Sequence, residues 1–293
     1  MISQEIISFL DNEFTVKRKD VFSSIMPFID KNYCDYCTDV YKQFYQGIML
    51  DNSSDIHKVA CACFLSSYTI DYAISKGCQL LIVKHPLDWS EKSSEFLAIP
   101  KSSYEKCKQF GLSVYVIHSA IDRHDIFSPS LNLAKKLNLT IEGKLNFKED
   151  IFGVYGKGYS SIDWAIQEVK QNLGINYVQV YNSKRVIKKI AIVSGGGDSL
   201  EYLKIAKNYE CDLYITGIIY SDQSEYAKKN NPIFREYAKE VGISLIAAGH
   251  YTTDKYGMIK LNQYLQNKGI KSEFIPETSK VFELGYKWQN IKI

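Results

Sequence analysis

Two short segments of the chain combine a histidine with an aspartate four residues further on. The first is residues 118–122 (HSAID) and the second is residues 250–254 (HYTTD), 132 residues later. Imidazole nitrogens and carboxylate oxygens are ligands that proteins use for Zn²⁺, Mn²⁺ and Fe²⁺. Each segment follows a short apolar run that reads as a buried strand, so the repeat predicts a shared metal site built from a duplicated unit.

A third histidine, His85, ends the apolar run 80–83 and precedes Pro86. Because proline donates no ladder hydrogen bond, the strand cannot continue past it. His85 therefore stands at a strand end, like the two histidine–aspartate segments. The predicted metal ligands are His85, Asp122, His250 and Asp254.

Each of these residues also has a simpler interpretation. Asp254 lies just before residues 255–267, which read as a helix, and aspartate is a favoured N-cap. Asp122 could serve a turn or a cap, and His85 could be only a polar strand end. We expect His118 to support the site by orienting Asp122 rather than as a ligand.

Residues 194–199 (SGGGDS) form a glycine-rich turn between a predicted strand and a predicted helix. Backbone amides of such a turn can bind an anion, which makes Ser194, Gly195, Gly196 and Gly197 candidate phosphate contacts. The segment Ser194–Ser199 also resembles the S-G-G-x-D-S pattern of PP-loop ATP pyrophosphatases, although nearly two hundred residues precede it. A tight turn with no ligand is the third interpretation.

Short apolar runs alternate with segments of helical length, which is typical of an α/β fold with largely parallel sheets. In the first half, strands are expected at 59–65, 80–83 and 113–117, with helices at 69–76 and 102–110. In the second half, strands are expected at 189–193, 212–216 and 244–249, with helices at 198–208 and 223–241. Between the halves we expect helices at 130–137 and 162–173 and strands at 152–158 and 177–181.

The two halves correspond in detail, since residues 78–83 (CQLLIV) resemble residues 211–216 (CDLYIT). We therefore predict two similar, intertwined α/β lobes, with mostly parallel sheets flanked by helices. The first lobe is expected to span 1–125, with 250–293 packing on it, and the second 126–249. The metal site is expected between them, because α/β sheets bind ligands at the carboxyl ends of their strands.

Composition favours a soluble, cytoplasmic protein. The 36 basic and 33 acidic residues are interspersed and give a net charge of +3, so no nucleic-acid surface is indicated. No run approaches the ~20 apolar residues that span a bilayer, and the N-terminus lacks the basic region of a signal peptide. The seven cysteines include a C-x-x-C at 34–37, which we interpret as incidental thiols.

Taken together, the motifs resemble the Nif-three-like dinuclear metal centre family, whose bacterial members are named GTP cyclohydrolase I type 2 homologues. The resemblance covers about residues 47–265, and its landmarks occur in order. They are the strand ending in Lys84-His85-Pro86, the motif His118-x-x-x-Asp122 followed by residues 132–134, the turn 194–197, residues 214–217 and the segment 249–257.

The resemblance implies two α/β lobes, one or two divalent ions held by the four predicted ligands, and a homo-oligomer, often a hexamer. Three positions depart from the family pattern. Lys84 replaces the first histidine of a pair, Asp254 replaces a glutamate, and residues 218–221 replace a glutamate and a histidine pair. A protonated lysine has no lone pair and cannot be a ligand, so we expect one firmly held ion and a weakened or absent second.

Three functions follow from these motifs. The first is a metal-dependent hydrolase for a small, nucleotide-like substrate, in which Lys84 stabilises negative charge or acts as a base. The second is a non-catalytic metal-binding or scaffold protein that has partly lost its dinuclear site. The third is a PP-loop ATP pyrophosphatase.

Overall fold

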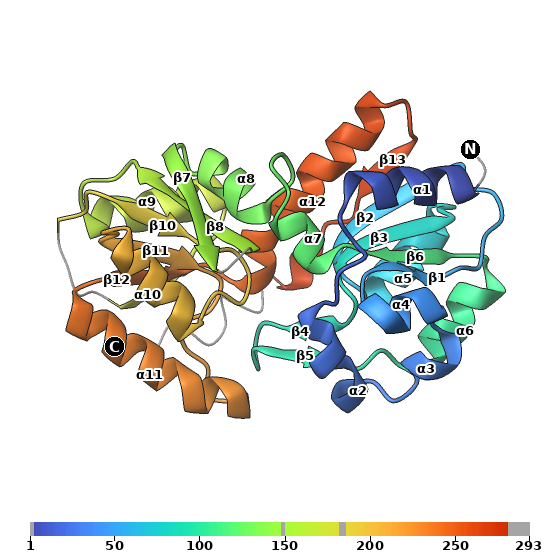
Figure 1. Ribbon diagram of the computed structural model, residues 1–293, viewed down its shortest axis with the longest axis horizontal. Coiled ribbons are helices and arrows are strands. Elements are labelled where there is room, and N and C mark those ends of the chain that lie inside the picture. Colours follow the sequence, from blue (N-terminus) through green and yellow to red (C-terminus); the bar gives the residue numbers. More distant parts are fainter. Residues whose placement is uncertain (1–2, 148–149, 182–185, 281–293) are drawn as a thin grey trace. The chain divides into compact units, whose positions relative to one another are not determined.

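The computed structural model describes residues 3–147, 150–181 and 186–280. Their contacts divide them into two compact units, each assembled from segments that are far apart in the sequence (Figure 1). Unit 1 comprises residues 3–89, 96–124 and 258–277, and unit 2 comprises residues 90–95, 125–257 and 278–280. The chain crosses between the units several times, so they are intertwined in sequence.

Unit 1 is built on a five-stranded sheet in the order β1-β6-β3-β2-β13, parallel except for the edge strand β1. Every residue of β2, β3 and β6 is buried, as expected for parallel strands covered on both faces. The strands are β1 (Gly47–Leu50), β2 (Val59–Phe64), β3 (Leu80–His85), β6 (Ser113–Val116) and β13 (Ser272–Phe274).

Local signals set the helix boundaries of unit 1. Helix α5 begins with a capping box, in which the Ser66 hydroxyl accepts from the Thr69 amide and the Thr69 hydroxyl accepts from the Ser66 amide. It ends just before Gly77, whose φ of 67° is left-handed. The helices are α1 (Ser3–Glu13), η1 (Val21–Ser24), α2 (Met26–Ile29), α3 (Tyr33–Tyr36), α4 (Asp39–Phe44), α5 (Ser67–Ser75), α6 (Lys101–Gln109) and α7 (His118–Asp122).

Unit 2 is built on a six-stranded sheet in the order β7-β8-β10-β11-β12-β9. Strands β10, β11 and β12 are parallel, and the outer pairings are antiparallel. The strands are β7 (Thr140–Phe147), β8 (Asp150–Lys157), β9 (Gln179–Tyr181), β10 (Ile190–Ile192), β11 (Leu213–Thr216) and β12 (Ser244–Ala247).

Helices cover both faces of this sheet, and the side chains alternate between them as the two-residue period of a strand requires. Ile190 and Ile192 pack into one core cluster together with α8 and α9, whereas Ala191 packs into the other with α10 and α11. The helices are α8 (Pro129–Lys136), α9 (Ile162–Leu173), α10 (Leu200–Asn208) and α11 (Glu225–Val241). A hairpin of β4 (Asp88–Ser90) and β5 (Glu95–Leu97) and the helix α12 (His250–Asn267) complete the chain's elements.

The predicted duplication is present. The order β2-α5-β3-α6-β6-α7 in the first half matches β10-α10-β11-α11-β12-α12 in the second, and each set of three parallel strands keeps sequence order in its sheet. In both halves the histidine is the first residue of the helix after the third strand. The mixed α/β class with largely parallel central strands is therefore confirmed.

The predicted start of one helix was wrong. Helix α12 begins at His250 rather than at residue 255, so Asp254 lies inside the helix and is not its N-cap. The segment 118–122, for which no helix was predicted, forms the short helix α7. In both cases, side chains distant in sequence satisfy the first amides of the helix, which a local pattern does not reveal.

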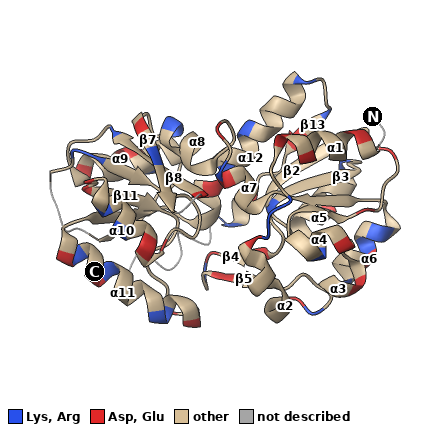
Figure 2. Cartoon of the chain, in the orientation of Figure 1, with Lys and Arg blue, Asp and Glu red and all other residues tan. Residues whose placement is uncertain are grey.

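The structure also shows how the charged residues are distributed, whether any helix could span a membrane, and the state of the cysteines. Lys and Arg residues alternate with Asp and Glu residues along the elements of both units (Figure 2). None of the helices in the described part of the chain has the length and apolar character needed to cross a membrane. All seven cysteines are free, and burial raises the pKa of the Cys37 thiol in the C-x-x-C segment, which favours an unreactive thiol there.

Candidate metal centre

Helix α12 presents His250 and Asp254 side by side within unit 2. The residues are four apart, which places them on one face of a helix, and the His250 Nε2 atom lies 3.1 Å from the Asp254 Oδ2 atom. Both side chains are almost completely buried. An imidazole and a carboxylate in this arrangement have the chemistry and the spacing to bind one divalent cation.

The glycine-rich turn closes over this pair. Gly195 has a φ of 68°, and a Cβ atom built on it would lie 2.8 Å from Asp254 Oδ2 and 2.9 Å from His250 Nε2. The Gly195 amide donates to the Thr253 hydroxyl at 2.9 Å, which fixes the turn against α12. The absence of a side chain at Gly195 therefore leaves room directly over the two ligand atoms, and the residues present fit a bound metal ion.

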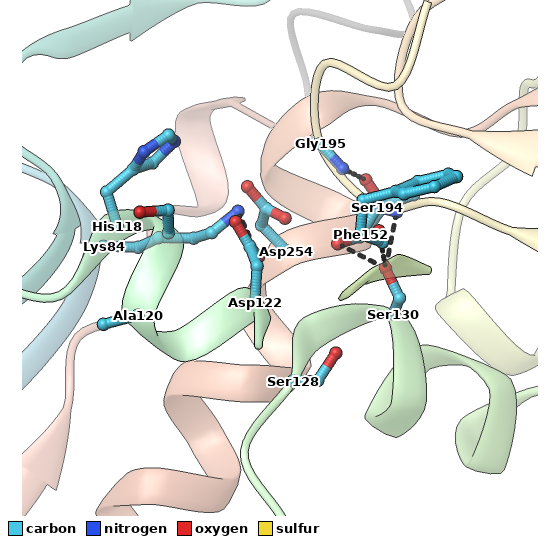
Figure 3. A network of polar contacts seen from close by, with 12 residues as sticks. Lys84, His118, Ala120, Asp122, Ser128, Ser130, Phe152, Ser194, Gly195 and Asp254 are labelled. Atoms are coloured by element: carbon cyan, nitrogen blue, oxygen red, sulfur yellow. Dashed lines mark hydrogen bonds and ion pairs between the residues drawn. The ribbon is translucent and has the colours of Figure 1, made fainter. Parts of the chain in front are cut away.

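The turn itself is largely committed to internal hydrogen bonds. The Ser194 amide donates to the Ser130 hydroxyl at 3.0 Å, and that hydroxyl also contacts the Ser194 hydroxyl (Figure 3). With the Gly195 amide bound to Thr253, two of the four predicted phosphate contacts already have acceptors. Among the four, Gly196 is the exposed glycine.

Asp198 does not face solvent as a nucleotide-binding loop would require. Its carboxylate accepts from the Asn231 amide at 2.6 Å, and burial raises its pKa. The Gly197 carbonyl is held by the Tyr214 hydroxyl at 2.7 Å. This geometry favours a tight structural turn beside His250 and gives no support to the pyrophosphatase interpretation.

Glu91, which the sequence did not single out, holds the beginning of α12. Its carboxylate accepts from the His250 amide at 3.1 Å and from the Tyr251 amide at 2.6 Å. The side chain is 4% exposed and lies in the tip of the β4–β5 hairpin, which belongs to unit 2. No local signal could have revealed it, because the partners are about 160 residues apart.

In unit 1, Lys84 forms an ion pair with Asp122. The Lys84 Nζ atom lies 3.1 Å from Asp122 Oδ1, and the lysine side chain is only 4% exposed (Figure 3). Lys84 is the penultimate residue of β3 and Asp122 the last residue of α7. The predicted ligand Asp122 thus has a cationic partner from the protein itself.

His118 has a different partner from the one we expected. Its Nδ1 atom lies 2.9 Å from Asp20 Oδ1, and among the described residues His118 makes no hydrogen bond or ion pair with Asp122. The Asp20 carboxylate also accepts from the Ser119 and Phe22 amides. Burial by itself would raise the Asp20 pKa, but the charge and hydrogen bonds of His118 and these amides outweigh it and lower the pKa to about 2.

The His85 ring is enclosed by aromatic side chains of unit 1. It stacks on Phe64 with ring centroids 4.6 Å apart and an interplanar angle of 12°, and the His118 ring lies 4.9 Å away. Phe22 and Phe96 approach it from other directions. At 1% exposure His85 is held by packing, so its orientation is fixed before any ligand binds.

The fold and these residues define a class: duplicated α/β proteins in which each half carries a histidine and an aspartate one helical turn apart after its third parallel strand. The family model described as Duf34/NIF3 (NGG1p interacting factor 3) matches residues 37–280. The chain belongs to this family.

Sequence comparison also finds similar proteins that share one name. A protein of Borreliella burgdorferi named "GTP cyclohydrolase 1 type 2 homolog" is 30% identical over 221 residues, covering 73% of this chain and 81% of the relative. A protein of the same name from Pyrococcus horikoshii is 28% identical over 283 residues, covering 94% of this chain and 98% of the relative.

Solved structures share the fold. The structure titled "Structural genomics, protein ybgI, unknown function" has a TM-score of 0.70 at 19% identity, over 94% of this chain and 98% of the other. "Reduced HcgD from Methanocaldococcus jannaschii" has a TM-score of 0.65 at 21% identity, over 94% and 97% of the two chains. At this level of identity the likeness establishes the architecture.

The Asp20 carboxylate should stabilise the fold in a pH-dependent way. Because its pKa is 3.8 in a model peptide and about 2 in the folded protein, its contribution is full above the higher value and is lost as the pH falls through the lower one. Asp20→Asn is expected to reduce the free energy of unfolding near neutral pH by about 2 kcal/mol.

Urea unfolding of wild type and variant between about pH 5 and pH 2 would measure this contribution. The difference between the two proteins should shrink toward the acid end, and a difference that stays constant would contradict the assignment. Asp51→Asn, at an exposed aspartate, is the control and should show little difference at any pH.

Proposed function

We propose that the protein binds one divalent metal ion, Zn²⁺, Mn²⁺ or Fe²⁺, through His250 and Asp254, and uses it in the hydrolysis of a small, nucleotide-like substrate. The observation that carries the proposal is the close pair of His250 Nε2 and Asp254 Oδ2, beside which Gly195 leaves space because it has no side chain. An imidazole and a carboxylate are ligands that proteins commonly use for these ions.

The Lys84–Asp122 ion pair favours a stoichiometry of one metal ion per chain over two. A carboxylate that already faces an ammonium group at 3.1 Å gains less from a second cation, and a protonated lysine offers no lone pair. Asp122 is therefore proposed to neutralise Lys84 rather than to bridge two metals. In the motif of the family, the position of Lys84 is the first of two histidines. This chain is therefore proposed to carry a lysine cation where its relatives carry a metal ligand.

When bound, the ion supplies Lewis-acid chemistry for hydrolysis. His250 and Asp254 would hold the ion from one face of α12. The nucleotide-like substrate rests on the relatives, which are named GTP cyclohydrolase 1 type 2 homologs. A second candidate is a metal-binding scaffold without catalysis, which the neutralised Lys84–Asp122 pair favours.

Metal content tests the binding site directly. Protein purified without chelator should contain about one divalent ion per chain by elemental analysis, and His250→Ala should contain almost none because a central ligand is missing. Turnover of a panel of nucleotides and phosphoesters with added Mn²⁺ or Zn²⁺ then separates the two candidates. Activity that requires both metal and His250 supports the hydrolase, whereas metal binding without turnover supports the scaffold. Wild-type protein that neither retains nor rebinds metal would rule out both.

Gly195→Ala should block the site from above. The new Cβ would lie within 3 Å of both ligand atoms, and overpacking of this kind costs about 1–3 kcal/mol, which corresponds to about 5- to 150-fold in metal affinity. Titration with Co²⁺, followed by absorbance, would measure the loss.

Gly174→Ala is the matched control for Gly195→Ala. Gly174 has nearly the same left-handed φ, 67°, but a Cβ there meets nothing within 4 Å. It should cost stability through backbone strain while leaving Co²⁺ affinity unchanged. Equal loss of affinity in both variants would show that strain, not the space over His250 and Asp254, explains the effect.

Lys84→His should restore a second ion. The substitution removes the ammonium group and places an imidazole next to Asp122, so the zinc content is expected to rise from one ion per chain to two. Lys58→His, which alters another lysine–carboxylate pair in unit 1, with Glu273 at 2.5 Å, should leave the zinc content at one. A Lys84→His protein that still binds one ion would show that Lys84 does not set the stoichiometry.

A further inference from the structure

The carboxylate of Glu91 bridges the first two amides of α12. One oxygen accepts from His250 N at 3.1 Å and the other from Tyr251 N at 2.6 Å. The hairpin tip that carries Glu91 has a second anchor in unit 2, because the Ser221 hydroxyl donates to the Ser93 carbonyl at 3.0 Å. The tip is thus fastened at two points, and Glu91 is held against the helix.

Helix α12 lacks the groups that usually satisfy such amides. The residue before it is Gly249, which has no side chain, and the first turn contains no acidic residue. The first amides of a helix have no partners within it, and together they carry a partial positive charge. In most helices a Ser, Thr, Asp or Asn at the N-cap provides the acceptor; here a glutamate from another part of the chain does so.

This matters because the proposed ligand His250 is the first residue of the helix. A cation bound at His250 and Asp254 would lie near the positive end of an 18-residue helix, where helix charge and metal charge repel. A buried carboxylate on the same amides offsets that charge. It also fixes the backbone of the first turn, from which both ligand side chains project.

We propose that Glu91 is a positioning residue of the metal centre, which holds the first turn of α12 and offsets its positive end so that a dication can bind at His250 and Asp254. The inference rests on the proposed metal binding and goes beyond it, since Glu91 itself offers its oxygens to amides. It assigns the β4–β5 hairpin a role in metal affinity that neither its sequence nor its distance along the chain would suggest.

Glu91→Gln tests the role of the charge. Glutamine keeps the length of the side chain and one acceptor oxygen but removes the negative charge. Loss of a group that supports metal ligands lowers affinity by about 10–100-fold, and we expect a loss in this range for Co²⁺, measured by absorbance titration. Glu91→Asp, which retains the charge, should recover part of the affinity. Glu95→Gln, in the same hairpin, should bind Co²⁺ as the wild type does.

Urea unfolding of the metal-free proteins separates positioning from folding. The proposal expects the Co²⁺ affinity of Glu91→Gln to fall under conditions in which the metal-free variant is fully folded. It is overturned if folded Glu91→Gln binds Co²⁺ as tightly as the wild type, or if Glu91→Asp binds as weakly as Glu91→Gln. It also fails if the wild type binds no metal, in which case the proposed function fails with it; wild-type binding that is indifferent to Glu91 overturns this inference alone.

Discussion

The beginning of helix α12 is the constraint on which unit 2 depends. A histidine as first residue and an aspartate one turn later bring Nε2 and Oδ2 to 3.1 Å, and the surrounding backbone is shaped to permit this. Gly195 passes over the two ligand atoms, and a Cβ on Gly217 would lie 2.8 Å from the His250 Cα and 2.4 Å from the Gly195 carbonyl oxygen. Gly195 and Gly217 are therefore required because the ends of β10, β11 and β12 pack closely around the first residue of α12.

The second constraint is that buried charges need partners. A buried charge without compensation is strongly unfavourable, and each charged group near the predicted ligands has a compensating group. Lys84 is paired with Asp122, Asp20 with His118, and the Glu91 carboxylate with two amides. These pairs hold the side chains in position.

The two halves consequently differ in the partners of their histidine–aspartate segments. Helices α7 and α12 occupy equivalent positions and start with equivalent histidines, but α7 has 5 residues and α12 has 18. His118 is engaged by Asp20, and the aspartate of its segment is engaged by Lys84. His250 instead lies beside the aspartate of its own segment. In the first half, the Lys84 ammonium is thus the cationic partner of the segment's aspartate.

The sequence by itself determined the class of fold and the ligand candidates. Apolar runs of strand length, helix-length segments between them and the 133-residue repeat are local or periodic signals, and they placed helix α9 at the residues observed. Only the tertiary structure determined which side chains form hydrogen bonds with the residues of the two histidine–aspartate segments. Asp20 meets His118 across 98 residues and Glu91 meets His250 across 159, and no local pattern encodes such contacts. For the same reason the start of α12 was misplaced: its first amides are satisfied by Glu91, whose position only the folded chain reveals.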